Sequence, residues 1–92
     1  VKGSGHFEPF LHACQTGNLD FVKFLISKGA SVQAVSMVGD NGLHYASKYG
    51  KSNIVRFLLE QGLDANVENN DHETPLLLAC QGSHLDVTKV LV

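Results

Sequence analysis

The 92-residue chain has no tryptophan, only two cysteines and no long hydrophobic run. A membrane span needs about 20 consecutive apolar residues, and the first ten residues, VKGSGHFEPF, contain no apolar signal core. Charge of one sign is also scarce, because seven basic and nine acidic residues are scattered along the chain and the formal net charge is −2. The sequence therefore argues against membrane insertion and against nucleic-acid binding driven by phosphate neutralisation.

Motifs for metal binding and catalysis are also missing. The five histidines are not arranged as H-E-x-x-H, there is no C-x-x-C, and no Walker-type loop is present. His12 and Cys14 are two residues apart, so on one helix they point in directions about 200° apart and do not form a nucleophile and base pair. We expect no catalytic residues, no cofactor and no metal in this chain.

What the sequence does contain is an internal repeat. EPFLHACQTGNLDFVKFLI, from Glu8, aligns without a gap with TPLLLACQGSHLDVTKVLV, from Thr74, and NGLHYASKYGKSNIVRFLL, from Asn41, begins midway between them. A 33-residue unit buries its apolar face by stacking on its neighbours. We expect one domain over residues 6–92, with repeats at about 6–35, 36–68 and 69–92, the last truncated. Residues 1–5 are interpreted as a linker or as residues added by cloning.

Each copy has the pattern of two short helices and a turn. Asn41 and Thr74 are candidate N-caps of a first helix, and Asn18 of a second helix. The second helices carry such wide apolar stripes that we expect them to be covered on more than one side. Residues in the left-handed backbone conformation are expected to end the helices. For the first helices these are Gly17, Gly50 and the less suitable Ser83, and for the second helices they are Gly29 and Gly62.

These residues resemble the ankyrin repeat, whose pattern runs T-P-L-H-x-A-A, then a glycine, V-V-x-L-L and G-A-D-x-N. TPLLLACQGSHLDVTKVL follows it well and NGLHYASKYGKSNIVRFLLEQGLDANVE more loosely, over about residues 6–92. The resemblance implies an all-α solenoid of stacked helix-turn-helix units with β-turn or hairpin connections. Three departures stand out: Glu8 replaces Thr, Asn41 and Gly42 replace Thr-Pro, and only His44 occupies the histidine position.

The family binds protein partners on its concave face and turn tips, and the matching positions here are candidate contacts. Exposed apolar side chains among them are typical of interface anchors, although packing against a neighbouring turn is the alternative. The positions are Phe7, Gln15, Thr16, Met37, Val38, Asp40, Lys48, Tyr49, Asn70, Asp71, Glu73 and Gln81. The mixed charge of Lys48, Asp71 and Glu73 favours a protein or peptide partner.

Cys14 and Cys80 occupy one repeat position two layers apart. At about 8 to 10 Å per layer their Cα atoms are expected about 20 Å apart, which is beyond disulfide reach. We expect both to be small, buried and reduced core thiols, with a reactive role as the less favoured alternative. Reduced thiols suit a cytoplasmic or nuclear location.

His44 is expected to be a structural hydrogen-bonding residue, whereas His6, His72 and His84 are expected on the solvated surface. The segment LLEQGLDAN has a spacing similar to that around asparagines hydroxylated in some ankyrin repeats, so Asn66 is a candidate for hydroxylation. A turn-stabilising asparagine is the favoured alternative at this position.

Two functions fit this sequence. The chain is either a protein-interaction scaffold or adaptor, or the regulatory or targeting arm of a larger enzyme, ion channel or ubiquitin-ligase adaptor. Flanking sequence distinguishes the two, because such proteins carry their chemistry or membrane spans outside the array. Since the pattern stops at Val92 inside a second helix, we expect further repeats or a cap beyond it.

Overall fold

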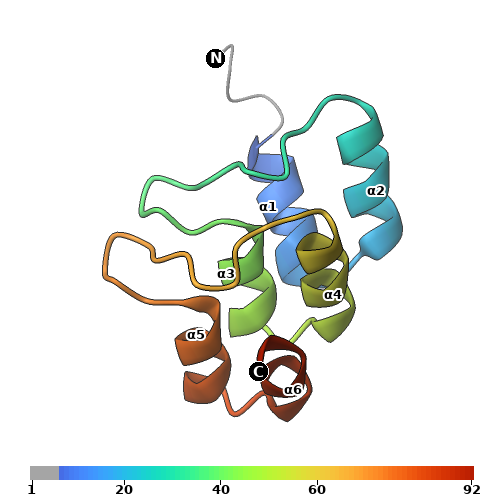
Figure 1. Ribbon diagram of the computed structural model, residues 1–92. Helices are drawn as coiled ribbons and strands as arrows, with labels where there is room; N and C mark the ends of the chain where they lie inside the picture. The colour runs from blue at the N-terminus through green and yellow to red at the C-terminus, as the bar shows by residue number, and fades with distance from the viewer. Residues whose placement is uncertain (1–6) are drawn as a thin grey trace.

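A computed structural model describes residues 7–92, and over this range the chain is a stack of helix pairs (Figure 1). Six helices follow one another, and no strand occurs among these residues. They are α1 (Phe7–Thr16), α2 (Leu19–Ser27), α3 (Gly42–Lys48), α4 (Ser52–Glu60), α5 (Pro75–Gln81) and α6 (Leu85–Leu91). Corresponding helices begin one repeat apart, α3 and α5 at Gly42 and Pro75, and α2, α4 and α6 at Leu19, Ser52 and Leu85. The predicted all-α fold is confirmed.

The helices form two rows, with α1, α3 and α5 in one and α2, α4 and α6 in the other (Figure 1). Two long connections join the pairs, which we name the first arm (residues 30–41) and the second arm (residues 62–74). Both arms project to the same side, beside the row of first helices (Figure 1). A single bridge between Val35 and Asn41 closes the first arm into a hairpin.

The helices begin where the sequence places capping side chains. Asn18 Oδ1 accepts a hydrogen bond from the Phe21 N–H at 3.1 Å, and Thr74 Oγ1 accepts one from the Leu77 N–H at 3.2 Å. Each of these bonds satisfies an N–H that has no partner within its helix. These expected N-caps are confirmed.

The departure from Thr-Pro at the start of α3 has a packing reason. A β carbon on Gly42 would lie 2.9 Å from Leu58 Cδ1 and 3.0 Å from Cys14 Sγ. Any larger residue, proline included, would force these core side chains to move.

In the turn between α5 and α6, Ser83 adopts a left-handed backbone with φ 59° where the other repeats have glycine. The expected left-handed turns are confirmed.

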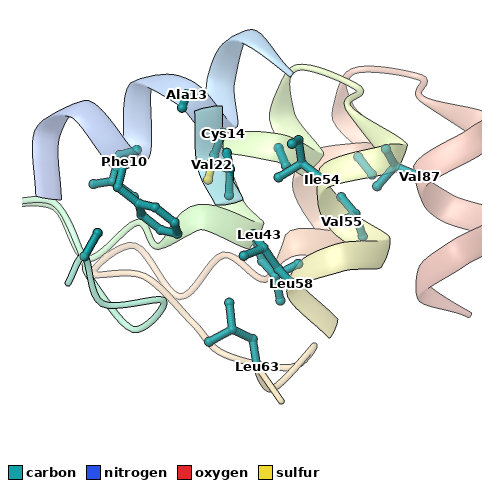
Figure 2. Close-up of a cluster of buried hydrophobic side chains, with 14 residues drawn as sticks. Phe10, Ala13, Cys14, Val22, Leu43, Ile54, Val55, Leu58, Leu63 and Val87 are labelled. Atoms are coloured by element: carbon teal, nitrogen blue, oxygen red, sulfur yellow. The ribbon is translucent and has the colours of Figure 1, made fainter. Parts of the chain in front are cut away.

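One hydrophobic core runs through all three repeats. Figure 2 shows its side chains converging from α1, the second-row helices and α3. The residues that are completely shielded from water include Phe10, Cys14, Val22, Leu43, Ala46, Ile54, Val55, Leu58, Ala79 and Val87. Because the core belongs to no single repeat, each helix pair depends on its neighbours for burial.

The expectation that every second helix is covered on more than one side is wrong for α2, and also for the start of α6, where Leu85 is 63% exposed. Phe21 is 42% exposed and Phe24 is 52% exposed. At the position of Phe21, Ile54 in α4 and Val87 in α6 are completely buried. The difference arises because α4 and α6 each follow another helix pair, whereas no helix pair precedes α2 among the residues described.

The expectation of two buried thiols is also half wrong. Both cysteines are free, but Cys14 is buried and Cys80 is exposed. Cys14 is covered by the start of the following repeat, since its Sγ touches the Gly42 backbone region. Cys80 lies in the last of the three repeats, where no described helix pair covers the equivalent surface.

The three histidines that were expected on the surface also have different outcomes. His72 is exposed, as predicted, and His6 lies outside the residues that the structure describes. The prediction is wrong for His84, which is half-buried and whose Nε2 donates to the Lys48 carbonyl at 2.8 Å. Its ring packs over Gly50 and Gly82, which have no side chains in the way, and so it ties the third repeat to the second.

Candidate protein-binding groove

An open groove of about 520 Å³ lies between α1, α3 and the first arm. Most of its wall is apolar. It is lined by Leu11, His12 and Gln15 of α1, Tyr45 of α3, and Ser36, Met37 and Val38 of the arm. The groove therefore lies between two neighbouring repeats, with the tip of the first arm at its side.

The tip of the first arm holds two apolar side chains out in solvent. Met37 is 93% exposed and Val38 is also exposed. A tight turn fixes them, because the Ser36 N–H donates to the Asp40 carbonyl at 2.8 Å and the Gly39 N–H donates to the Ser36 carbonyl at 3.0 Å. Ser36 Oγ accepts further bonds from the N–H groups of Val38 and Asp40, each at 3.3 Å. The apolar tip is thus presented by an ordered turn.

The helical walls follow from the spacing of their residues. Leu11 and Gln15 are four apart on α1, so they stand one above the other on the same face. Leu11 is buried and forms the floor of the groove, while Gln15 and Tyr45 are half-buried at its sides. The groove accordingly offers an apolar floor with an amide and a phenol beside it.

The second arm holds the first arm in place. The Asn70 N–H donates to the Val38 carbonyl at 2.9 Å, and Asn70 Nδ2 donates to the Met37 carbonyl at 3.2 Å. Gly39 leaves room for this contact, because a β carbon there would lie 2.7 Å from Asn70 Oδ1 and its φ is 84°. Met37 and Val38 therefore have their backbone fixed by the following repeat.

Asn69 organises the second arm, and sequence reasoning did not single it out. Its Nδ2 donates to Asp40 Oδ1 at 2.8 Å and to Glu73 Oε1 at 2.9 Å. Its Oδ1 accepts from the N–H groups of Asp71 and Glu73, both at 2.9 Å. The side chain is buried, so one amide satisfies four polar groups across two arms.

His44 performs the structural role predicted for it. The ring is completely buried, its Nδ1 accepts from the Asn41 N–H at 3.0 Å, and its Nε2 donates to the Glu73 carbonyl at 2.9 Å. In return, Asn41 Oδ1 accepts from the His44 N–H at 3.0 Å. His44 thereby links the start of α3 to the end of the second arm.

The structure brings three of the predicted contact residues into the groove, namely Gln15, Met37 and Val38. Asp40 and Asn70 instead make hydrogen bonds between the arms, whereas Glu73 bonds with Asn69 of its own arm and with His44 of α3. Thr16 at the end of α1, Lys48 and Tyr49 at the end of α3, Asp71 on the second arm and Gln81 on α5 are exposed outside the groove. Phe7 opens α1, and its side chain lies outside the described part of the chain.

Three of these outlying residues have side chains with local partners. Thr16 Oγ1 donates to the Ala13 carbonyl at 3.2 Å, and the Lys48 ammonium lies 5.8 Å from the centre of the Tyr49 ring. Sequence reasoning missed Tyr45, which lies one helical turn before Tyr49. Residues four apart share a helix face, so this spacing could have identified Tyr45 from Tyr49 and Leu11 from Gln15.

Asn66 is exposed on the second arm. Its N–H donates to Asp64 Oδ1 at 2.9 Å, so the turn at this place is stabilised by the Asp64 carboxylate. No hydrogen bond from the Asn66 side chain occurs within residues 7–92. The exposed amide is therefore accessible to a modifying enzyme.

Other kinds of site find little support in the described residues. Over residues 7–92 no three candidate metal ligands gather in one place. Cys14 is buried, and this desolvation raises the pKa of its thiol to about 12, which keeps it protonated and unreactive at neutral pH. In the same range, every helix is too short or too polar to cross a bilayer.

Comparison with known families settles the architecture. A family model for ankyrin repeats matches three copies of the repeat over residues 10–92. The chain belongs to the ankyrin-repeat family. Ankyrin repeats are protein-interaction modules and are generally not catalytic.

The ankyrin relatives are longer proteins of several kinds. The chain is 33% identical over 81 residues to the B-cell lymphoma 3 protein homolog of Mus musculus, covering 88% of this chain and 18% of that protein. It is 32% identical over 87 residues to the probable E3 ubiquitin-protein ligase XBOS32 of Oryza sativa subsp. japonica, and the match covers 92% of this chain and 18% of that protein. It is 29% identical over 92 residues to a transient receptor potential cation channel subfamily A member 1 homolog of Caenorhabditis elegans, and the match covers 100% of this chain and 8% of that protein. The chain thus spans less than a fifth of each of these proteins.

Proposed function

We propose that this ankyrin-repeat chain binds a partner protein or peptide by receiving an apolar side chain of the partner in the groove between α1, α3 and the first arm. The observation that carries the proposal is the 93% exposure of Met37 on a turn that hydrogen bonds hold in place. An exposed apolar side chain on an ordered turn beside an apolar groove is a typical interface anchor.

The energetics favour this use of Met37. Complete burial of a methionine side chain contributes about 1.5 to 3 kcal/mol. The turn and the Asn70 contacts have already ordered the backbone, so binding does not have to order it again. Methionine also adapts its unbranched side chain to partners of different shape.

The charges around the groove support a partner with a basic residue next to its apolar anchor. Asp40, Glu68, Asp71 and Glu73 all belong to the two arms, and Asp71 is exposed beside Asn70, which contacts Met37 and Val38. Negative potential at this end steers cationic groups toward the groove and repels phosphates. A basic, partly apolar protein segment is therefore favoured over a nucleic acid.

A peptide library tests the proposal without a known partner. Peptides selected from a random library against the whole chain are expected to share an apolar residue. Their affinity for a Met37→Asp variant is expected to fall about tenfold or more, which corresponds to about 1.4 kcal/mol. Met37→Leu is the matched control, because it keeps an apolar side chain of similar size and is expected to retain binding.

Equal affinity of the selected peptides for wild type and Met37→Asp would place binding outside the groove. In that event a Tyr49→Ala variant tests the surface at the far end of α3, where Lys48 and Tyr49 are exposed. Circular dichroism of each variant checks that the helices are intact. Loss of helicity in the Met37→Asp variant would contradict the role assigned to this exposed side chain.

The alternative proposal is that the repeats form the regulatory or targeting arm of a larger protein. It is favoured by the shares of the relatives that the chain covers, 18% of a ubiquitin-protein ligase and 8% of a channel homolog. Sequencing the gene on both sides of this segment tests it. A transmembrane or catalytic domain in the same reading frame supports the alternative, and its absence supports a free-standing adaptor.

Two further parts of the proposal concern the cellular setting. The free thiols of Cys14 and Cys80 support a reducing compartment, the cytoplasm or the nucleus.

The exposure of Asn66 supports its hydroxylation, and mass spectrometry of the protein from its native cells is the test. An unmodified Asn66 there would contradict the assignment.

A further inference from the structure

Met37 is the only methionine of the chain, and its side chain is 93% exposed at the tip of the first arm. Peroxides oxidise the thioether sulfur of a methionine that solvent reaches, whereas packing in a core protects it. A peroxide therefore reaches Met37 while the stack remains folded. Because the chain has no second methionine, methionine oxidation is confined to this one position.

The side chain of Met37 takes no part in holding the arm together. The bonds that fix the turn are made by backbone groups, by Ser36 Oγ and by the Asn70 amide, which donates to the Met37 carbonyl at 3.2 Å. Within residues 7–92 the Met37 sulfur makes no hydrogen bond. A chemical change at the sulfur therefore leaves every bond that holds the arm in place.

The second arm shows that this kind of turn accepts a polar side chain at its tip. The first arm is closed by the Ser36 N–H, which donates to the Asp40 carbonyl at 2.8 Å, and the second arm by the equivalent bond at 3.0 Å. The second arm carries the polar Asn70 at the repeat position of Met37. The turn thus does not need an apolar side chain here, and a polar group at the end of Met37 is compatible with it.

We propose that Met37 is a reversible oxidation site, and that hydroperoxides weaken partner binding in the groove by converting it to the sulfoxide. The inference rests on the proposed function, in which Met37 is the apolar anchor beside the groove. In the reaction the sulfur lone pair attacks the terminal oxygen of the hydroperoxide, so that an S–O bond forms and the O–O bond breaks. The sulfur loses two electrons, and the hydroperoxide leaves as water or an alcohol after its proton passes to the departing oxygen.

Oxidation turns an apolar anchor into a polar one. The sulfoxide oxygen accepts hydrogen bonds from water, and pressing it against an apolar partner removes that water without supplying a donor. Affinity for the partner is therefore expected to fall about tenfold or more. The change is reversible, because methionine sulfoxide reductases use the two electrons of a dithiol to release the oxygen as water and restore the thioether.

The thiols of the chain react apart from this site. Cys14 is buried and its pKa is raised to about 12, so it stays protonated and is spared by peroxide. Cys80 is exposed, but it lies on α5 and does not line the groove. A Cys80→Ala background removes this second exposed sulfur and leaves Met37 as the one accessible site of oxidation.

Peptide affinity before and after oxidation tests the switch. The probes are library peptides that bind the chain and lose affinity for Met37→Asp. With the Cys80→Ala chain, peroxide is expected to add one oxygen at Met37 by mass spectrometry and to lower their affinity about tenfold or more. Treatment with reductases for both sulfoxide epimers is expected to remove the oxygen and restore the affinity. Circular dichroism is expected to stay the same throughout.

The matched control is the same chain with Met37→Leu. It has no thioether, so its affinity for each peptide is expected to be the same before and after peroxide, whatever its starting value. A second measurement uses the bound state. A saturating peptide is expected to slow the oxidation of Met37, because binding covers the sulfur, whereas a peptide that does not bind is expected to leave the rate unchanged.

Two results would overturn the switch and leave the groove proposal intact. One is full affinity of the oxidised chain for peptides that Met37→Asp no longer binds, and the other is a Met37 that resists peroxide while a free methionine peptide in the same solution is oxidised. Equal peptide affinity of Met37→Asp and wild type would instead contradict the groove as the binding site, and the switch with it.

Discussion

The hydroxyl of Ser47 is a single polar atom with a measurable effect on stability. It is fully buried and has no hydrogen-bond partner among the described residues. A buried hydroxyl without a partner costs about 1 to 3 kcal/mol. We therefore expect Ser47→Ala to raise the free energy of unfolding by about 1 kcal/mol, as measured by urea denaturation.

A second serine provides the control for Ser47. Ser36 Oγ accepts from two N–H groups of the first arm, so Ser36→Ala is expected to lower the free energy of unfolding by about 1 kcal/mol. Ser47→Ala is expected to raise the free energy of unfolding and Ser36→Ala to lower it. Opposite changes would show that the effect at Ser47 comes from the missing partner and not from the loss of a hydroxyl as such. A destabilised Ser47→Ala variant would show that this hydroxyl has a partner.

The two thiols are expected to differ in reactivity. Burial raises the pKa of Cys14 from 9.0 to about 12, whereas Cys80 is exposed. At mildly alkaline pH and low protein concentration, iodoacetamide is expected to modify Cys80 and to spare Cys14 until the chain unfolds. Mass spectrometry of labelled peptides measures this. Equal labelling of both thiols in the folded chain would contradict the burial of Cys14.

The same burial of Cys14 predicts how stability depends on alkaline pH. Between pH 9 and pH 12 the unfolded chain loses the Cys14 proton and the folded chain keeps it. Since the folded state then binds more protons, the free energy of unfolding falls as the pH rises through this window, and this thiol adds no pH dependence below it. A Cys14→Ala variant is expected to show a smaller fall over the same window.

At the scale of elements, the arms depend on Asn69 more than on any other polar side chain. Its amide makes four hydrogen bonds, to Asp40, Asp71 and Glu73. Asn69→Ala leaves these partly buried groups without their shared partner, and the free energy of unfolding is expected to fall by about 2 to 3 kcal/mol. Thermal or urea unfolding measures the change.

Asn66 is the matched control for Asn69, because it is an exposed asparagine on the same arm. Asn66→Ala is expected to change the free energy of unfolding by less than about 0.5 kcal/mol. Equal effects of the two substitutions would mean that the arm does not depend on the Asn69 network.

The elements themselves were predictable from local chemistry, and the role of Asn69 was not. Asn18 and Thr74 cap helices because the requirement for a cap is local to a few residues. In ENNDHE, by contrast, several side chains have the same hydrogen-bonding groups. Which of them turns inward depends on the position of the first arm, 29 residues away at Asp40.

At the scale of the whole molecule, the middle repeat is expected to be the most stable part. α3 and α4 together contribute more buried residues than either other helix pair, whereas α2 and α6 each bury a single one, Val22 and Val87. In a stack each repeat is stabilised by its neighbours, and within residues 7–92 the middle repeat has a neighbour on both sides. Native-state hydrogen exchange is expected to be slowest in α3 and α4 and faster in α2 and α6.

Uniform protection of all six helices would show instead that the stack opens only as one unit. The groove lies between the first and second repeats, so its α3 wall is expected to be the more rigid one.

The wrong predictions of burial also have their cause at the scale of the whole molecule. The repeat pattern makes the same prediction for every copy, so it placed Cys80 and Phe21 in the core together with Cys14 and Ile54. Burial depends on which repeats stand on either side, and a repeat position does not contain that information. The groove was missed as a unit for the same reason, since Leu11 and Met37 belong to different repeats.

The contact of Asn70 with the Met37 and Val38 carbonyls makes the binding surface depend on a repeat that does not line it. Occupancy of the groove and folding of the third repeat are therefore thermodynamically linked, since each favours the same position of the first arm. A chain shortened after the second repeat would retain every groove residue and yet have to order the arm on binding. The array thus has a direction, in which each repeat prepares the binding surface of the one before it.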